Sequence, residues 1–513
     1  MRRKKSPDKD GMEVDDVHTT LVPPKGEPIP SAAKWGTPNW SGWNAQLVLV
    51  GTLLFSLTCP LWLGQVDAQA GQVVVGLICF LSILMFLGAA PVAMSHQGRK
   101  LYTKAEDKGG KDVKHAVCVT LYKEADEVVI DTLKSLNEQS VAKNITVLLA
   151  MEEATDRVPE RIAKYKAVLT NVAGMKHYVH PKGLALEVPG KCSNEAWSAR
   201  EFVKELQAAG TSLDDWTFTS SDSDCVFHKE SFADLERKFR EWKGDRPAIW
   251  QHLPAFFVKR DESYWFALGA SMVRIAWTAS LNPLFNIQPV SVYSLAMNTL
   301  IKAGYHHPGY IGEDFMIFAQ TTLAYGTTPS MQILDQPCVM GPTLGETSMI
   351  ALNEFTAQAY RWAAQILEGC GFMWHNATMA QVPVVVFYLT CFWWARLWSS
   401  SIPVFVISAV VAVHTELIDG GEVLGTGCKL EWLVYFLAFM YSLTVITAPD
   451  GESKYRARFG KDEFPDLSIV QQATRFVLLP LVSTVLPLVE LVAFVHLLMK
   501  GKVLIAAQTV SVK

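Results

Sequence analysis

The sequence predicts an α/β domain with a mainly parallel sheet, embedded between transmembrane α-helices. Two observations support this prediction. Apolar residues gather in two blocks near the ends of the 513-residue chain, which is typical of a membrane protein with a more polar middle. Between these blocks, short apolar runs alternate with segments of helical periodicity, and this alternation favours repeated strand–helix units around a parallel sheet.

The composition excludes several classes of protein. Half of the residues are hydrophobic and 19% are charged, so the whole chain is not a disordered polymer. A net charge of -4 lacks the basic footprint of a nucleic-acid-binding protein. The nine cysteines are scattered and form no CxxC pair, which indicates neither a structural zinc site nor a disulfide framework. We therefore expect buried thiols and no nucleic-acid partner.

Residues 1–44 are predicted to form a disordered cytosolic tail. They begin with a basic run and then mix acids, bases and six prolines with few apolar residues, a composition that buries too little surface to fold. No signal peptide is indicated, because the first apolar run starts only near Ala45. A second, shorter tail is expected at 500–513.

Two transmembrane helices are predicted within residues 45–95. The segments 45–63 and 73–95 carry no charge and reach the roughly 20 residues that cross a bilayer. Basic residues precede the first segment and follow the second, whereas the connection between them has none. The positive-inside rule therefore places the tail and the middle of the chain in the cytosol.

A second membrane block is predicted over residues 381–499. It contains three apolar stretches, at 382–414, 430–448 and 476–499. The first stretch is long enough to count as one tilted helix or as two, so the block has three or four helices and the chain has five or six spans. We expect a multi-pass protein of the plasma membrane or of the Golgi or endoplasmic reticulum membrane, with its catalytic domain in the cytosol.

The middle of the chain, 110–340, is predicted to be the α/β domain. Ligands of such sheets bind beyond the carboxyl ends of the parallel strands, and acidic residues follow two of the predicted strands here. The predicted elements are strands at 115–122, 144–151 and 216–220, and helices at 124–136 and from Ser193 or Asn194, as the capping residue, to Leu206.

The motif Asp222-Ser223-Asp224 directly follows the last of these strands. Two carboxylates in a chain that leaves a strand can offer hard oxygen ligands to Mg²⁺ or Mn²⁺, and that ion can also bridge a diphosphate. The alternative is a solvated turn. His228 lies close enough in sequence to approach such an ion, although a packed core histidine is the stronger interpretation.

A second acidic pair, Glu313-Asp314, stands between Gly312 and an amphipathic run at 315–325. A carboxylate at the start of a helix can serve only as an N-cap. The functional alternative is a general base that takes the proton from an acceptor hydroxyl while this oxygen attacks a sugar.

The third motif is Gln358-Ala-Tyr-Arg361-Trp362, in a segment at 341–380 that is predicted to contain interfacial helices. On a helix Gln358, Arg361 and Trp362 share one face. Arginine holds phosphate oxygens through paired bonds. The alternative is an interfacial helix with a headgroup-level indole. Lys191 follows Gly190 at a helix start, where a diphosphate can bind.

In this order, and together with Tyr122-Lys123-Glu124, these motifs resemble the membrane-bound family 2 glycosyltransferases with a GT-A fold. Cellulose, chitin and hyaluronan synthases belong to that group. The resemblance covers about residues 110–370. It implies that a cytosolic hydroxyl displaces the nucleotide directly and inverts the anomeric carbon. A small-residue segment at 266–271 resembles the acceptor loop of the synthases.

The resemblance also implies a role for each motif residue. Three kinds of contact are expected: with the donor and its metal ion, with the reacting hydroxyl, and with the acceptor. The expected roles are nucleoside contacts from Tyr122, Glu124 and one of Glu152 and Glu153, diphosphate contacts from Lys191 and Arg361, metal and sugar-nucleotide binding by Asp222 and Asp224, base catalysis by Asp314 with Glu313 as its neighbour, and acceptor contacts from Gln358 and Trp362.

The predicted function is a membrane polysaccharide synthase that uses a nucleoside-diphosphate sugar, with a UDP-sugar as the expected donor. Lys123, the glutamates after the second strand and the missing FxVTxK gating loop depart from the family pattern. A transferase that adds a single sugar to a lipid or glycolipid therefore stays open. Glu490, inside the last apolar run, supports a more remote alternative, a transporter with a regulatory cytosolic domain.

Overall fold

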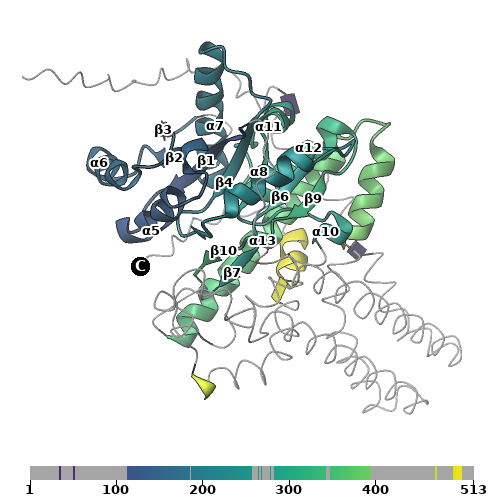
Figure 1. Ribbon diagram of the computed structural model, residues 1–513. Helices are drawn as coiled ribbons and strands as arrows, with labels where there is room; N and C mark the ends of the chain where they lie inside the picture. Colours follow the sequence, from purple (N-terminus) through teal and green to yellow (C-terminus); the bar gives the residue numbers. More distant parts are fainter. Residues whose placement is uncertain are drawn as a thin grey trace, which may run out of the picture.

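The computed structural model describes residues 112–184, 187–256, 282–341 and 347–393, together with a few short stretches (Figure 1). Within these residues, no helix combines the length and the apolar character needed to cross a membrane. The short stretches and single residues are 34–35, 50–51, 264, 267, 278, 468–470, 489–490 and 492–499.

Most of the predicted membrane segments lie outside the described residues. A helix at 382–393 forms the beginning of the predicted span 382–414. The number of spans and their orientation stay predictions. Except for 50–51 and 267, the structure does not describe 45–63, 73–95, 430–448, the tail 500–513 or the loop-like segment 266–271. Of the predicted span 476–499 it describes 489–490 and 492–499.

The described elements alternate between strands and helices through most of the domain (Figure 1). In chain order they are β1 Lys114–Leu121, α5 Asp126–Asn137, the 3-10 turn η2 Ala142–Asn144, β2 Ile145–Glu152, α6 Val158–Val168, β3 Gly174–His180, α7 Lys191–Ala208, β4 Trp216–Ser221, β5 Val226–Phe227, α8 Ser231–Glu241, β6 Ala248–Gln251, β7 Pro254–Phe256, α10 Asn282–Phe285, β8 Tyr293–Ala296, α11 Met297–Ala303, α12 Glu313–Tyr325, β9 Ser330–Ile333, β10 Cys338–Met340 and α13 Ser348–Asn376.

The main sheet has seven strands in the order β3-β2-β1-β4-β8-β6-β9. Four neighbouring pairs are parallel: β1 with β2, β2 with β3, β1 with β4 and β6 with β9. Within the described part of this main sheet, only β8 runs against its neighbours, β4 and β6. A small second sheet has the order β5-β10-β7. The prediction of a mainly parallel α/β sheet is confirmed, and all three predicted strands appear within a residue or two.

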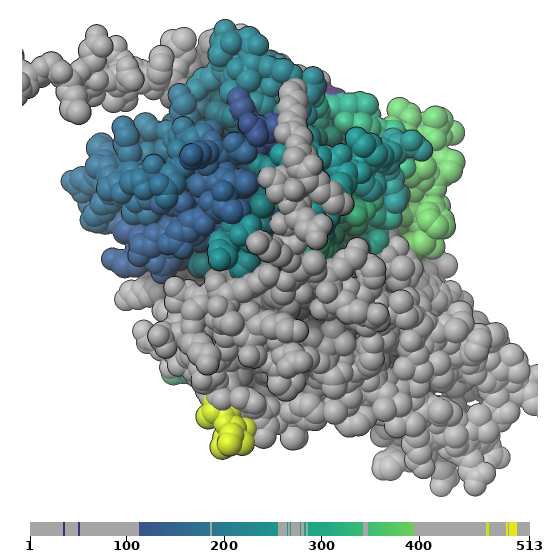
Figure 2. All heavy atoms as spheres, in the orientation of Figure 1, coloured from purple at the N-terminus to yellow at the C-terminus, as the bar shows by residue number. Residues whose placement is uncertain are grey.

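Helices cover both faces of the main sheet because side chains alternate along its strands. On β1, Ala116 and Cys118 face the core that is shared with α7, α11 and α12. Val117 and Val119 face the core that is shared with α5, α6 and α8. Nearly all of these side chains are fully buried, so the domain has three layers. In the space-filling view the blue residues of β1 to α6 form one flank, and the bright green residues near the end of 347–393 form the opposite one (Figure 2).

Helix α12 differs from its prediction. The run 315–325 was expected to be amphipathic, yet eleven of the 13 residues of α12 are buried. The reason is its position between two partners, with α11 on one side and the long helix α13 on the other. Phe315 shows the second contact, since its ring occupies the space that a Cβ on Gly369 of α13 would need. The start of α12 is therefore held firmly in the core.

Two residues of the predicted N-terminal tail contact the domain. The indole Nε1 of Trp35 donates a hydrogen bond to the carbonyl oxygen of Ala303 at 2.7 Å, and its ring meets Phe372 of α13 edge to face at 5.6 Å. Gly304 has a φ of +93° and passes within 3.2 Å of the Trp35 side chain, measured from an ideal Cβ position. These two residues lie against the domain because an apolar indole finds a partner surface that composition alone does not reveal. Disorder of the tail stays a prediction.

Candidate active site

The carboxyl ends of three parallel strands bring the predicted site residues to one edge of the sheet. Leu121 pairs with Met151, and Val119 pairs with Ser221. The segments that follow β1, β2 and β4 therefore leave the sheet side by side, as predicted. Strand β8 runs the other way, so its first residue, Tyr293, lies at the same edge opposite Ser220.

Helix α7 starts at this edge with an unusual backbone turn. Its N-cap is Gly190, whose φ of 151° and ψ of -171° belong to a region that is essentially open to glycine alone. The expected cap by Ser193 or Asn194 is wrong, since both residues lie inside the first turn. Ser193 Oγ donates to the carbonyl oxygen of Gly190 at 3.0 Å. Asn194 Nδ2 donates to Glu152 Oε1 at 3.2 Å, which ties α7 to the end of β2.

Lys191 lies at the centre of the site. Its Nζ is 2.7 Å from Asp222 Oδ1, 2.9 Å from Glu313 Oε1 and 3.9 Å from Glu195 Oε1. It also donates to the carbonyl oxygen of Ser291 at 3.0 Å. Burial alone would lower the pKa of Lys191, but the three carboxylates outweigh burial and raise this pKa well above its usual range. One permanent cation thus joins α7, the end of β4 and the start of α12.

The acidic pair at the start of α12 has two different environments. Glu313 reaches Lys191, whereas Asp314 Oδ1 accepts a hydrogen bond from the amide of Phe315 at 2.6 Å. Burial, followed by the nearby charge of Glu313, raises the pKa of Asp314 to about 8. A carboxylate with such a pKa is a stronger base than an ordinary aspartate. Neither side chain caps the helix, whose N-cap is Gly312.

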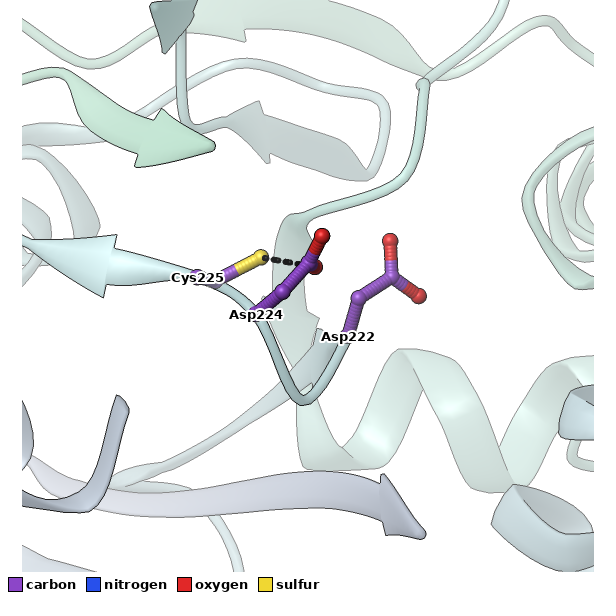
Figure 3. Close-up of side chains that lie close together, drawn as sticks. All are labelled: Asp222, Asp224 and Cys225. Carbon is purple, nitrogen blue, oxygen red and sulfur yellow. Dashed lines mark hydrogen bonds between the residues drawn. The ribbon is translucent and has the colours of Figure 1, made fainter. Parts of the chain in front are cut away.

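Asp222 and Asp224 form the candidate metal centre. Their carboxylates and the Cys225 Sγ offer ligand atoms that all lie within 4.8 Å of one another, and both carboxylates point to the same side of the turn (Figure 3). Burial raises the pKa of the Cys225 thiol well above its usual range, so this sulfur keeps its proton and is a poor ligand. Two hard carboxylates with access to solvent suit Mg²⁺ or Mn²⁺.

Asp224 lies among other negative charges. Desolvation and the charge of Asp222 raise the pKa of Asp224 to about 7, and Glu124 contributes in the same direction. The side chain of Asp224 is exposed, and the negative charges of Asp222 and Glu124 act on it. A concentration of negative charge of this kind favours the binding of a cation. His228 is a buried core residue outside this group, as the stronger interpretation of the sequence held.

The predicted nucleoside side of the edge is held by an arginine that the sequence patterns did not single out. Arg161 of α6 donates from Nη1 to the carbonyl oxygen of Tyr122 at 3.4 Å and from Nη2 to that of Glu124 at 2.5 Å. Its Nε lies 2.9 Å from Asp126 Oδ1. The backbone amide of Tyr122 donates to Glu124 Oε2 at 2.6 Å. This loop is therefore preorganised, and the buried guanidinium is the reason.

The two acids at the end of β2 separate. Glu152 is buried and bonded to Asn194, close to the start of α7. Glu153 is exposed, and its Oε2 accepts a hydrogen bond from the amide of Lys182 in the turn after β3 at 2.8 Å. Of this pair, Glu152 thus lies next to α7, the helix that begins at Lys191.

The third motif lies on α13, on the face that packs against the start of α12. Gln365 fills the space that a Cβ on Gly312 would need, and Arg361 precedes Gln365 by about one helical turn. Gln358, Arg361 and Trp362 are half-buried. Trp362 meets Phe355 edge to face at 6.1 Å, and burial lowers the pKa of Arg361. Among the described residues, no ion pair joins Arg361 to the acids around Lys191.

Glu368, on the same helix, is a buried acid that the sequence analysis missed. It is 3% exposed, and its Oε2 accepts a hydrogen bond from the amide of Ile311, just before the acidic pair, at 3.1 Å. Burial raises the pKa of Glu368 to about 8. Its sequence signal is weak, because a single glutamate in an apolar helix stretch looks like a surface position until the packing of α13 is known.

We expect Glu368 to make stability depend on pH. The unfolded carboxyl ionises near pH 4 to 5, whereas the folded one keeps its proton up to about pH 8. Between these values the unfolded state binds fewer protons, so this contribution to the free energy of unfolding is lost as pH rises. Glu368→Gln cannot ionise, so its Tm relative to wild type should rise between about pH 5 and about pH 8. The exposed control Glu127→Gln should show no such trend, and parallel Tm curves for Glu368→Gln would contradict the assignment.

Comparisons with known proteins give structural similarities only. No protein-family model and no curated protein match the sequence. A mannosyltransferase from Pyrobaculum calidifontis in complex with GDP-Man and Mn²⁺ aligns with a TM-score of 0.41 at 11% identity, over 74% of this chain and 99% of its own. S. aureus TarS aligns with a TM-score of 0.32 at 14% identity, over 67% of this chain and 55% of its own.

A shorter form of S. aureus TarS, residues 1–349 in complex with UDP, aligns with a TM-score of 0.30 at 15% identity. This match covers 69% of the present chain and 94% of the TarS fragment. At these identities and scores, the function has to be inferred from the geometry of the site itself.

Proposed function

We propose that this protein is an inverting glycosyltransferase that transfers a sugar from a nucleoside-diphosphate sugar to a carbohydrate acceptor at a membrane. The observation that carries the proposal is the meeting of Lys191, Asp222 and Glu313 within ion-pair distance, at the carboxyl edge of a mainly parallel sheet. These residues come from the three separate motifs that bind a diphosphate, bind a metal ion and act as base in the family that the sequence resembles.

The donor is expected to bind along this edge. Asp222 and Asp224 would hold Mg²⁺ or Mn²⁺, which supplies positive charge to the leaving diphosphate. Lys191 already faces Asp222 at 2.7 Å, so its ammonium can also reach a phosphate oxygen placed there. Tyr122 and Glu124, in the loop that Arg161 holds, would line the nucleoside, with Glu152 behind it.

The acceptor is expected to approach from the side of α13. Asp314 would take the proton of the attacking hydroxyl, which makes this oxygen a better nucleophile at the anomeric carbon. Displacement from the side opposite the diphosphate inverts the configuration of that carbon. Gln358 and Trp362, on the helix that packs against the start of α12, would border the acceptor, and Arg361 would face the diphosphate.

The proposed product is a polysaccharide, and the proposed location is the cytosolic side of the plasma membrane or of a Golgi or endoplasmic reticulum membrane. The support is the sequence pattern of charge-free apolar segments with basic flanks. Extrusion of the polymer through the membrane helices belongs to the same proposal. Addition of one sugar to a lipid acceptor is the competing outcome of the test.

The test is transfer by the purified full-length protein in a lipid environment. Radiolabelled nucleotide sugars would be supplied one at a time with Mn²⁺, and the products would be separated by size and by extraction into organic solvent. A labelled product of high molecular weight is expected, and label in the organic phase would indicate a glycolipid product instead. No transfer from any UDP-, GDP- or other nucleotide sugar would contradict the proposed function.

Trp362→Ala should impair use of the acceptor more than binding of the donor. An indole supplies stacking area for a sugar ring and no contact to phosphate, so transfer should fall about tenfold or more, while the Kd for the nucleotide changes little. Phe355→Leu, which alters the edge-to-face partner of Trp362, controls for repacking of α13. Loss of nucleotide binding in a folded Trp362→Ala protein would move this residue to the donor site.

A further inference from the structure

A set of buried polar side chains lies beneath the proposed active site. Glu195 is on α7, four residues after Lys191. His306 is in the loop between α11 and α12, and Tyr293 is the first residue of β8. All three are 0% exposed. We call these three residues the buried brace.

The contacts of the brace lead from α7 to α12 through hydrogen bonds and one longer polar contact, between Glu195 and His306. Ser220 Oγ, on β4, donates to Glu195 Oε1 at 2.7 Å, and Glu195 Oε2 lies 3.6 Å from His306 Nε2. The Tyr293 hydroxyl is 2.8 Å from His306 Nε2 and 3.5 Å from the carbonyl oxygen of Glu313. The path therefore ends at the first residue of the helix that carries Glu313 and Asp314.

The two members that share the central hydrogen bond are both neutral. Burial, with a further contribution from the charge of Lys191, lowers the pKa of His306 to about 3, so the imidazole is neutral. Burial raises the pKa of Tyr293 well above its usual range, so the phenol keeps its proton. A neutral imidazole has one N–H and one acceptor nitrogen, so the Tyr293 hydroxyl donates to Nε2 of His306 in one tautomer and accepts from it in the other.

We infer that the buried brace is a positioning device, which sets the distance between Lys191 and the Glu313–Asp314 pair for sugar transfer. The inference rests on the proposed function. The brace touches the same elements that meet above it at Lys191, namely α7, β4, the start of β8 and the start of α12. Burying polar groups costs free energy unless they are bonded, and apolar residues could fill the same volume.

Positioning matters here because transfer needs the base and the diphosphate contact at a fixed separation. A shift of about 1 Å in a reacting group can lower a rate by about 10²-fold. Lys191 also bonds the carbonyl oxygen of Ser291, two residues before Tyr293. The brace thus lies under the two elements that Lys191 joins, α7 and the start of α12. Its three side chains are buried and do not touch the substrates.

The test compares Tyr293→Phe with the matched control Tyr178→Phe. Tyr178 is also buried, and its hydroxyl donates to Glu205 Oε1 at 2.8 Å. Glu205 lies 14 residues beyond Lys191 on α7, which corresponds to about 20 Å along the helix. Both substitutions remove one buried hydroxyl and its hydrogen bond, so a purely structural role predicts similar losses of Tm and similar activity.

The positioning role predicts a different pattern. Tyr293→Phe should lower kcat about 10- to 100-fold, while the KM and the Kd for the nucleotide sugar stay within about twofold of wild type, and Tyr178→Phe should keep the wild-type kcat. An unchanged kcat in Tyr293→Phe, or an equal loss in both variants, overturns the inference. If instead the wild-type protein transfers no sugar from any donor, the proposed function fails first. A lowered affinity for the nucleotide sugar in Tyr293→Phe would also overturn the positioning role.

Discussion

Asp314→Asn is expected to lose most sugar transfer while the protein still folds and binds nucleotide. Asparagine keeps the shape of the side chain and the oxygen that accepts from the amide of Phe315, but it cannot take a proton. A positioned general base typically contributes ~10²–10⁴-fold to a rate, so we expect kcat to fall within this range. The measurement is transfer of labelled sugar, paired with nucleotide affinity from calorimetry or a labelled analogue.

Glu313→Gln should cost less than Asp314→Asn. The side-chain oxygen of glutamine can still accept a hydrogen bond from Lys191, whose Nζ is 2.9 Å from Glu313 Oε1. The substitution removes one of the negative charges around this cation. A moderate fall in kcat is therefore expected. If Glu313→Gln abolished transfer and Asp314→Asn kept it, Glu313 would be the base.

The pH profile gives an independent check of the same assignment. Burial and the charge of Glu313 raise the pKa of Asp314 to about 8, and only the deprotonated form can act as base. In the wild-type enzyme kcat/KM should therefore rise with pH up to about 8, since this ratio reports the free enzyme. Asp314→Asn should lose this rise. Glu127→Gln, at the matching second position of α5, should keep both the rate and the profile, and a fully active Asp314→Asn enzyme would return Asp314 to a structural role.

Removal of divalent cations should produce the second large effect. An ion at Asp222 and Asp224 typically supplies several kcal/mol of stabilisation to a developing charge, so EDTA should abolish transfer and added Mn²⁺ or Mg²⁺ should restore it. Asp224→Ala removes one of the two carboxylates at the candidate metal centre. We expect this variant to bind Mn²⁺ more weakly and to lose transfer even at high Mn²⁺ concentration.

Asp214→Ala is the matched control for the metal site. Asp214 is an exposed aspartate that precedes the opposite end of β4, so its removal changes the net charge equally without touching the Asp222–Asp224 turn. Mn²⁺ binding can be followed by the loss of free-ion signal in electron paramagnetic resonance, which does not depend on activity. Full activity of Asp224→Ala in the presence of EDTA would rule out the metal centre.

The local pattern of the chain was sufficient to predict β1, β2, β4, α5 and most of α7. The runs at 115–122 and 144–151 form β1 and β2, as expected of apolar stretches that are short and contain β-branched residues. Asp222 was expected at the carboxyl end of a strand because it follows Trp216–Ser221, where Trp, Phe and Thr favour a strand. Such features depend on neighbours in sequence, so a single chain reveals them.

Long-range contacts decided the rest of the site. No sequence pattern singled out Glu195, Arg161 or Glu368, although each is buried and holds part of the proposed site. Their burial depends on the order of strands in the sheet and on the packing of α13 against α12. A charged side chain has the same local pattern whether it faces solvent or a distant partner, so its role becomes visible only after folding.

The sequence by itself determined the α/β class, the order of the motifs and the placement of Asp222 and Asp224 after a strand. Tertiary structure alone decided that β8 runs antiparallel beside β4, which brings Tyr293 and the carbonyl of Ser291 to the site. It also decided that Lys191 joins Asp222 and Glu313. The physical reason is that periodicity and strand ends arise from adjacent residues, whereas ion pairs and strand partners join residues that are far apart in the chain and meet only when the core closes.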